Sequence, residues 1–231
     1  MTMTVLVVRV FADEAGRHGN ELGVVLDASA LDTELGPKLT AHLGFSETVF
    51  VDAITDDGAD VRIFNPTAEM KLAGHPLVGT ASVLAAATGS HPAVLRPRLA
   101  DPVATWHDGD ATWIRANTAY APEFTFTQLA SPEEIDALPV PPLEARSHGQ
   151  YWAWIDEPAG VLRVRTFVGA LGIREDEATG AAALHQAQRL GREATIRQGR
   201  GSVLYVRPAR EAGWSEVGGR VVAEPMRVVE L

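Results

Sequence analysis

Two stretches of the sequence repeat one pattern, and such a repeat restricts the folds open to the chain. The first stretch runs from Arg62-Ile63-Phe64 into Ala73-Gly74-His75-Pro76. The second runs from Arg165-Thr166-Phe167 into Ala178-Thr179-Gly180-Ala181. Each is typical of a β-strand that ends in a polar turn containing glycine and then opens directly into an Ala-rich helix. The sequence therefore predicts two similar units, each with a helix that begins beside a strand end.

The start of each predicted helix has a chemistry of its own. The first backbone N–H groups of a helix have no partner within the helix, and the helix dipole places partial positive charge there. Two such helix starts facing each other would hold a small anion. The alternative is that both units are ordinary strand-turn-helix elements of an α/β or α+β protein, and their similarity alone does not decide between these interpretations.

Charge and composition exclude several classes of function. The 20 Lys and Arg residues against 30 Asp and Glu residues give a formal net charge of −10, with no basic run. We therefore expect neither nucleic acid nor an anionic membrane surface as a partner. The absence of cysteine excludes disulfides, zinc–thiolate sites and iron–sulfur clusters. No stretch approaches the ~20 apolar residues of a membrane span, so we expect a soluble cytoplasmic protein.

The order of predicted elements favours an α+β fold of two similar domains, residues 1–115 and 116–231. Strands are expected over residues 5–11, 24–26, 48–51, 60–64, 161–165 and 203–206, and helices over residues 29–43, 76–87 and 181–190. Pro37 indicates that the first helix starts later or is kinked. The second helix is apolar on all sides and should be buried, whereas the third carries His185, Gln186, Gln188 and Arg189 and should expose one face.

Three titratable residues are candidates for acid–base chemistry. Glu47 lies between a helix end and an apolar strand, where partial burial would raise its pKa; a solvated Glu at a strand start is the alternative. His75 lies at a helix start and can present its ring to a ligand or serve as a capping residue. Asp176 either contributes to a site or belongs to an acidic helix entrance. The remaining histidines have no ligand spacing, so no metal site is expected.

Several short motifs together resemble the phenazine-biosynthesis PhzF-like isomerase family, which is more distantly related to diaminopimelate epimerase. The matching pieces occur in family order: Gly19-Asn20, Ser46-Glu47-Thr48-Val49-Phe50, Arg62-Ile63-Phe64-Asn65-Pro66 with Glu69, Ala73-Gly74-His75-Pro76, Glu175-Asp176 with Ala178-Thr179-Gly180, Gln198-Gly199 and Val217-Gly218-Gly219. Several motifs in order are more specific than any one of them. The resemblance implies two matching β-barrel-like halves, each a curled, mostly antiparallel sheet wrapped around a central helix.

The resemblance also implies a function. It predicts cofactor-independent proton transfer on a small carboxylic acid, in a cleft between the halves of a homodimeric enzyme. Glu47 would carry the proton, and His75 and Asp176 would bind substrate and relay or tune the proton. Five further residues would contact the substrate: Asn20, Ser46, Gly74, Gly180 and Ala181. Such a reaction would suit secondary metabolism.

The sequence departs from the family pattern in three places. Ala181 replaces a serine whose hydroxyl would contact substrate, Glu21 replaces the proline of Gly-Asn-Pro, and the chain is short before Arg165. Two alternatives therefore stay open: a non-catalytic protein that binds small acids, or an enzyme for a different rearrangement or cyclisation. The identity of the substrate is not predicted.

Overall fold

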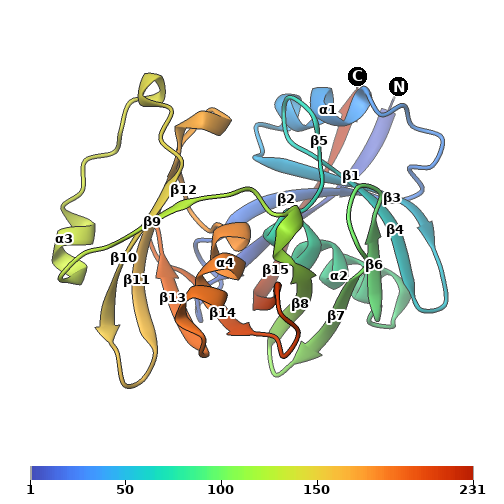
Figure 1. Cartoon of the computed structure of the whole chain (residues 1–231). Coiled ribbons are helices and arrows are strands. Elements are labelled where there is room, and N and C mark those ends of the chain that lie inside the picture. Colours follow the sequence, from blue (N-terminus) through green and yellow to red (C-terminus); the bar gives the residue numbers. More distant parts are fainter. Residues whose placement is uncertain (1, 231) are drawn as a thin grey trace.

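The computed structural model describes residues 2–230, in which one continuous curled sheet carries all the strands and the helices pack inside or beside it (Figure 1). The first strands are β1 (Thr2–Ala12), β2 (Asn20–Val25), β3 (Glu47–Ile54), β4 (Gly58–Phe64), β5 (Glu69–Met70), β6 (Val94–Pro97), β7 (Val103–Asp108) and β8 (Ala111–Asn117). The later strands are β9 (Thr125–Gln128), β10 (Gly149–Asp156), β11 (Val161–Val168), β12 (Ile173–Asp176), β13 (Ala194–Gln198), β14 (Ser202–Pro208) and β15 (Trp214–Glu230). The α-helices are α1 (Leu35–Leu43), α2 (Gly74–Thr88), α3 (Pro132–Asp136) and α4 (Gly180–Leu190), and short 3₁₀ turns are η1 (Thr118–Tyr120), η2 (Leu143–Ala145) and η3 (Gly169–Leu171).

The strand pairings repeat in the same order in two halves of the molecule. In the first half, β2 lies parallel to β3, β3 antiparallel to β4, β4 parallel to β6, and β6, β7 and β8 follow antiparallel. In the second half, β9 lies parallel to β10, β10 antiparallel to β11, β11 parallel to β13, and β13, β14 and β15 follow antiparallel. The predicted fold of two similar, mostly antiparallel halves is therefore confirmed.

The long strand β15 joins the two halves. Its residues 214–220 pair with β8, and its residues 220–230 pair with β1, where Glu230 lies opposite Thr2. Figure 1 accordingly shows the start of β1 beside the end of β15. The domain boundary near residue 115 stays a prediction.

Each half wraps its sheet around one central helix, as expected. Helix α2 packs against β1, β2, β3, β8 and β15, and its residues from Gly74 to Leu84 are mostly buried. Helix α4 packs against β14 and β15 and exposes Arg189, but Gln186, which was expected on the exposed face, is fully buried. The first predicted helix begins only at Leu35, with Pro37 in its first turn, where a missing N–H costs little. No helix within residues 2–230 is long and apolar enough to cross a membrane.

One expectation about the repeated motif was wrong. The strand was expected to turn directly into the helix, but in both halves the chain first folds back as a short antiparallel strand, β5 against β4 and β12 against β11. Asp176 is therefore the last residue of a strand rather than part of a helix entrance. Because successive side chains of a strand point to opposite faces, Glu175 and Asp176 point away from each other.

The repeated arginines hold equivalent loops against the sheet. Arg62 is 4% exposed, forms a two-pronged ion pair with Asp52 at 2.8 and 2.6 Å, and donates to the carbonyls of Ala28 and Leu31. Its guanidinium also lies 5.3 Å from the centre of the Phe50 ring. These contacts satisfy the planar fork of donors that distinguishes Arg from Lys.

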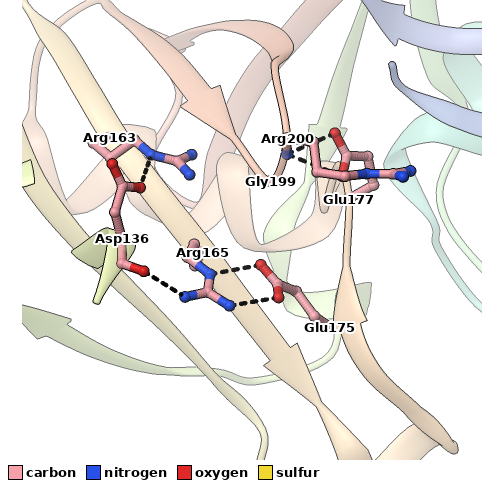
Figure 2. A pocket seen from close by; sticks show the side chains of 7 residues that line it. All are labelled: Asp136, Arg163, Arg165, Glu175, Glu177, Gly199 and Arg200. Atoms are coloured by element: carbon pink, nitrogen blue, oxygen red, sulfur yellow. Dashed lines mark hydrogen bonds and ion pairs between the residues drawn. The ribbon is translucent and has the colours of Figure 1, made fainter. Parts of the chain in front are cut away.

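Arg165 repeats this arrangement in the second half. It pairs with both oxygens of Glu175 at 2.7 Å and donates to the Leu138 carbonyl at 2.6 Å, and Figure 2 shows the pair with Glu175. Its guanidinium lies 5.0 Å from the Phe167 ring. The Arg-x-Phe part of the repeated motif is thus structural, which leaves the helix starts as its functional part.

We expect Arg62→Lys to lower the free energy of unfolding by about 3 kcal/mol, because the partly buried Asp52 carboxylate and two carbonyls lose the matched donors of a buried guanidinium. Urea denaturation of wild type and variant measures the loss. The control is Arg96→Lys, which alters an exposed pair with Asp57 and should change stability little. Equal losses in the two variants would contradict the structural role of Arg62.

Candidate active site

The two predicted helix starts meet in direct backbone contact. A Cβ placed on Gly180 would lie 2.8 Å from the Cα of Gly74 and 2.9 Å from the backbone nitrogen of His75. Only glycine at both positions permits this approach. The first hydrogen bonds within the helices are donated by Leu77 in α2 and Ala183 in α4. The N–H groups that precede them have no intrahelical partner. Because the two helix starts touch, the positive ends of both helices meet at the contact between Gly74 and Gly180.

A small cavity of about 40 Å³ lies at this meeting point. Seven of the eight predicted site residues line it: Ser46, Glu47, Gly74, His75, Asp176, Gly180 and Ala181. A larger open cleft of about 540 Å³ shares Ser46, Glu47 and Asp176 with it and is also lined by the eighth, Asn20. The structure therefore brings all eight residues together, from both halves of the chain.

Glu47 and His75 face each other at the wall of the cavity. Glu47 is the first residue of β3, directly after the turn that follows α1, and His75 is the second residue of α2. Their side chains are 14% and 6% exposed, and Glu47 Oε2 lies 3.3 Å from His75 Nε2. Neither atom has a hydrogen-bond partner of good geometry anywhere in residues 2–230. The solvated alternative for Glu47 is therefore wrong, and the site contains two buried polar atoms without a hydrogen-bond partner, which is unusual in a folded protein.

Burial changes the proton affinity of both side chains. It raises the pKa of Glu47 to about 8; the nearby Ser46 hydroxyl opposes this rise, and the charge of Asp176 adds to it. Burial also lowers the pKa of His75 to about 3. At neutral pH the pair is therefore a mostly protonated Glu and a neutral His, so their contact is not an ion pair.

Asp176 is fixed by donors on both of its oxygens. Asn20 Nδ2 donates to Oδ1 at 2.7 Å, and the Thr179 hydroxyl donates to Oδ2 at 2.7 Å. Gln198 Nε2 donates in turn to the Thr179 hydroxyl and to the Asp176 carbonyl, both at 2.8 Å. The carboxylate is thus a rigid part of the site, and its charge acts on Glu47 from a fixed position.

Some residues of the site had no predicted role. Thr179 and Gln198 belong to recognisable motifs, but their role in holding Asp176 depends on contacts between distant strands. The cavity also has an apolar side, formed by Pro122, Phe124, Val168, Leu171 and Ile173 of the second half. Scattered apolar residues give no sequence signal of a binding wall, because most such residues belong to the core.

A larger hollow of about 570 Å³ lies beside the cleft and is lined by charged side chains (Figure 2). Its three arginines are already engaged: Arg163 with Asp136, Arg165 with Glu175 and Arg200 with Glu177. The three positive and three negative side chains balance, so this hollow offers no unmatched charge to a ligand.

Comparisons with known proteins identify the family of the chain. A family model described as phenazine biosynthesis-like protein matches residues 8–98. The chain is 29% identical to a trans-2,3-dihydro-3-hydroxyanthranilate isomerase of Pseudomonas aeruginosa, across 94% of this chain and 92% of the relative. It is 30% identical to an isomerase of the same name from Pseudomonas fluorescens, across 79% of this chain and 78% of the relative.

A solved structure shows the same fold. The phenazine biosynthesis protein of the PhzF family from Enterococcus faecalis superimposes with a TM-score of 0.78 over the whole of both chains, at 19% identity. The motifs, the repeated fold and the named relatives lead to one assignment. The chain belongs to the phenazine-biosynthesis PhzF-like family and is an isomerase of that type.

Proposed function

We propose that this isomerase moves a proton between two carbon atoms of a small carboxylic acid bound in the cleft, with Glu47 as the proton carrier. The observation that supports it best is the buried contact of Glu47 with His75, in which Glu47 Oε2 and His75 Nε2 lie 3.3 Å apart and both lack a hydrogen-bond partner within residues 2–230. A carboxylate taken out of water is a stronger base than an ordinary Glu. A base with a pKa near the working pH is well suited to removing a proton from carbon.

In the proposed reaction the ionised Glu47 removes a proton from carbon next to an unsaturated system. The electron pair of the broken C–H bond shifts the double bond, and the carboxylic acid so formed returns the proton to another carbon of the same system. No electrons leave the substrate, so the step needs no oxidant, reductant or cofactor. His75, neutral and unpartnered at Nε2, would contact the substrate and orient it toward Glu47.

The substrate carboxylate would bind at the meeting point of α2 and α4. The free N–H groups at Gly74, His75, Gly180 and Ala181 surround this point, and the partial positive charge of both helix ends favours an anion there. This charge would also stabilise negative charge that develops when a proton leaves carbon. Ala181 offers only its backbone N–H, so recognition at this position needs no hydroxyl.

The body of the substrate would contact the apolar side of the cavity. Phe124, Val168 and Leu171 offer a hydrophobic surface in the same cavity as the Glu47–His75 pair. An unsaturated or cyclic acid satisfies both sides, with its carboxylate at the helix starts and its carbon skeleton against this surface. The substrate named for the curated relatives, trans-2,3-dihydro-3-hydroxyanthranilate, has this character. It is therefore the first probe, and secondary metabolism is the setting that we propose.

We expect Glu47→Gln to abolish the transfer, because the amide keeps the shape of the side chain and cannot carry a proton. Wild-type protein incubated with the probe in D₂O should give isomerised product with deuterium at carbon, detected by proton NMR and mass spectrometry. The control Glu34→Gln alters a glutamate whose side chain is 82% exposed and should leave the rate unchanged. Deuterium incorporation by Glu47→Gln at the wild-type rate would contradict the proposal.

The raised pKa of Glu47 also predicts how stability depends on pH. The folded protein holds the Glu47 proton up to about pH 8, whereas the unfolded chain releases it near pH 4.5. The folded state therefore binds more protons between these values, and the stability contributed by protonated Glu47 is lost as pH rises through this window.

We expect the free energy of unfolding of wild type to fall relative to that of Glu47→Gln as pH rises from about 4.5 to about 8, with a constant difference outside this window. Urea denaturation of both proteins at a series of pH values measures the difference. A difference that does not change with pH would show that Glu47 ionises at the same pH in the folded and unfolded protein.

A further inference from the structure

The amide of Asn20 is committed to the other half of the chain. Asn20 begins β2 in the first half, yet its Nδ2 atom donates to Asp176 Oδ1 at 2.7 Å and to the Ala178 carbonyl at 3.0 Å. An amide nitrogen has two hydrogens, so both are used within the protein. Only the Oδ1 atom of Asn20 is left to face a ligand in the cleft.

The backbone conformation of the two residues before Asn20 determines where this side chain points. His18 and Gly19 both have left-handed backbone conformations, with φ of 62° and 79°. A Cβ on Gly19 would lie 2.4 Å from the Val10 carbonyl oxygen, so only glycine fits there. The Gly19 N–H donates to the Ser202 hydroxyl of β14 at 2.8 Å, and that hydroxyl donates to Glu177 at 2.9 Å. The turn is therefore itself tied to the second half.

Asp176 is held from two directions as a result. Asn20 reaches one carboxylate oxygen from the first half, and Thr179 reaches the other from the second half. The carboxylate cannot rotate without giving up one of these hydrogen bonds. If the Asn20 amide were removed, Asp176 would keep only the bond from Thr179 and could turn toward the open cleft.

We propose that Asn20 is a positioning residue, which fixes the Asp176 carboxylate at the wall of the cavity that it shares with Glu47, so that its charge adds to the basicity of the proton carrier. This inference rests on the proposed function only for its effect on turnover. Because Asn20 and Asp176 come from different halves, this charge is held in place by a contact between the halves.

The first test follows the ionisation of Glu47 in the free protein, without substrate. Carbon-13 NMR of side-chain carboxyl groups, with Glu47 assigned by its absence in Glu47→Gln, gives its titration midpoint, near pH 8 in wild type. Asn20→Ala and Thr179→Val should each move this midpoint to lower pH, because each frees one oxygen of Asp176. In an Asp176→Asn background, Asn20→Ala should cause no further movement.

The matched control is Gln188→Ala. Gln188 Nε2 donates to the Thr118 hydroxyl at 3.1 Å and joins α4 to η1 outside the cleft. The variant Gln188→Ala removes a comparable long-range hydrogen bond, so it should lower stability about as much as Asn20→Ala does. It should leave the titration midpoint of Glu47 unchanged. An unmoved midpoint in Asn20→Ala, or an equal shift in Gln188→Ala, overturns the inference.

Turnover supplies the second readout. Asn20→Ala should lower kcat about tenfold and change KM by less than about twofold, because a positioning residue acts on the chemical step rather than on binding. A raised KM with an unchanged kcat would instead make Asn20 a substrate contact and overturn the inference. If wild type isomerises no acid, the proposed function fails, while the NMR titration still decides the role of Asn20.

Discussion

The contact between Gly74 and Gly180 is the constraint on which the site depends. Two helix ends of like partial charge repel each other, and here they approach until a single added methyl group would collide with backbone. The surrounding sheet holds them there, because α2 packs inside the first half and α4 against β14 and β15. This arrangement concentrates unpaired N–H groups in a small cavity with one apolar side, where they attract an anion more strongly than at an isolated helix end.

The two halves share one plan but differ in chemistry. Arg62 lies opposite Phe50 in the first half, and Arg165 lies opposite Tyr151 in the second. Counting back three residues from each partner makes Glu47 the counterpart of His148. In the same way His75, directly after Gly74, corresponds to Ala181, directly after Gly180. Only the first half thus holds the Glu–His pair.

This asymmetry fits a reaction with a single proton carrier. An enzyme that inverts a carbon centre needs an acid and a base on opposite faces, whereas a proton that leaves and returns on one face needs only one group. The second half contributes instead a fixed charge, Asp176, and the apolar side of the cavity. The duplicated halves therefore give the site its shape. The residues that differ between the halves leave the proton carrier in the first half only.

Much of this organisation is readable from the sequence because it depends on local patterns. The Ala-rich helices are predicted by the periodicity of their apolar residues and by the glycines that end them. The ordered motifs identify Glu47, His75 and Asp176 as candidate site residues. The burial of Glu47 is not readable, because a glutamate at a strand start has the same local sequence whether water or α2 covers it. The bond from Asn20 to Asp176 spans 156 residues, and no local pattern reports such a distance.

The pairing of β15 with β1 has a consequence for how the molecule acquires its structure. Thr2 lies opposite Glu230, so the sheet of the first half is completed by the far end of the chain. Bringing such distant segments together costs loop-closure entropy before any contact compensates it. Until β15 arrives, β1 presents an unpaired apolar edge of the kind that recruits other chains. The pairing of β1 with β15 is therefore also the place where an incompletely folded chain is most exposed to aggregation.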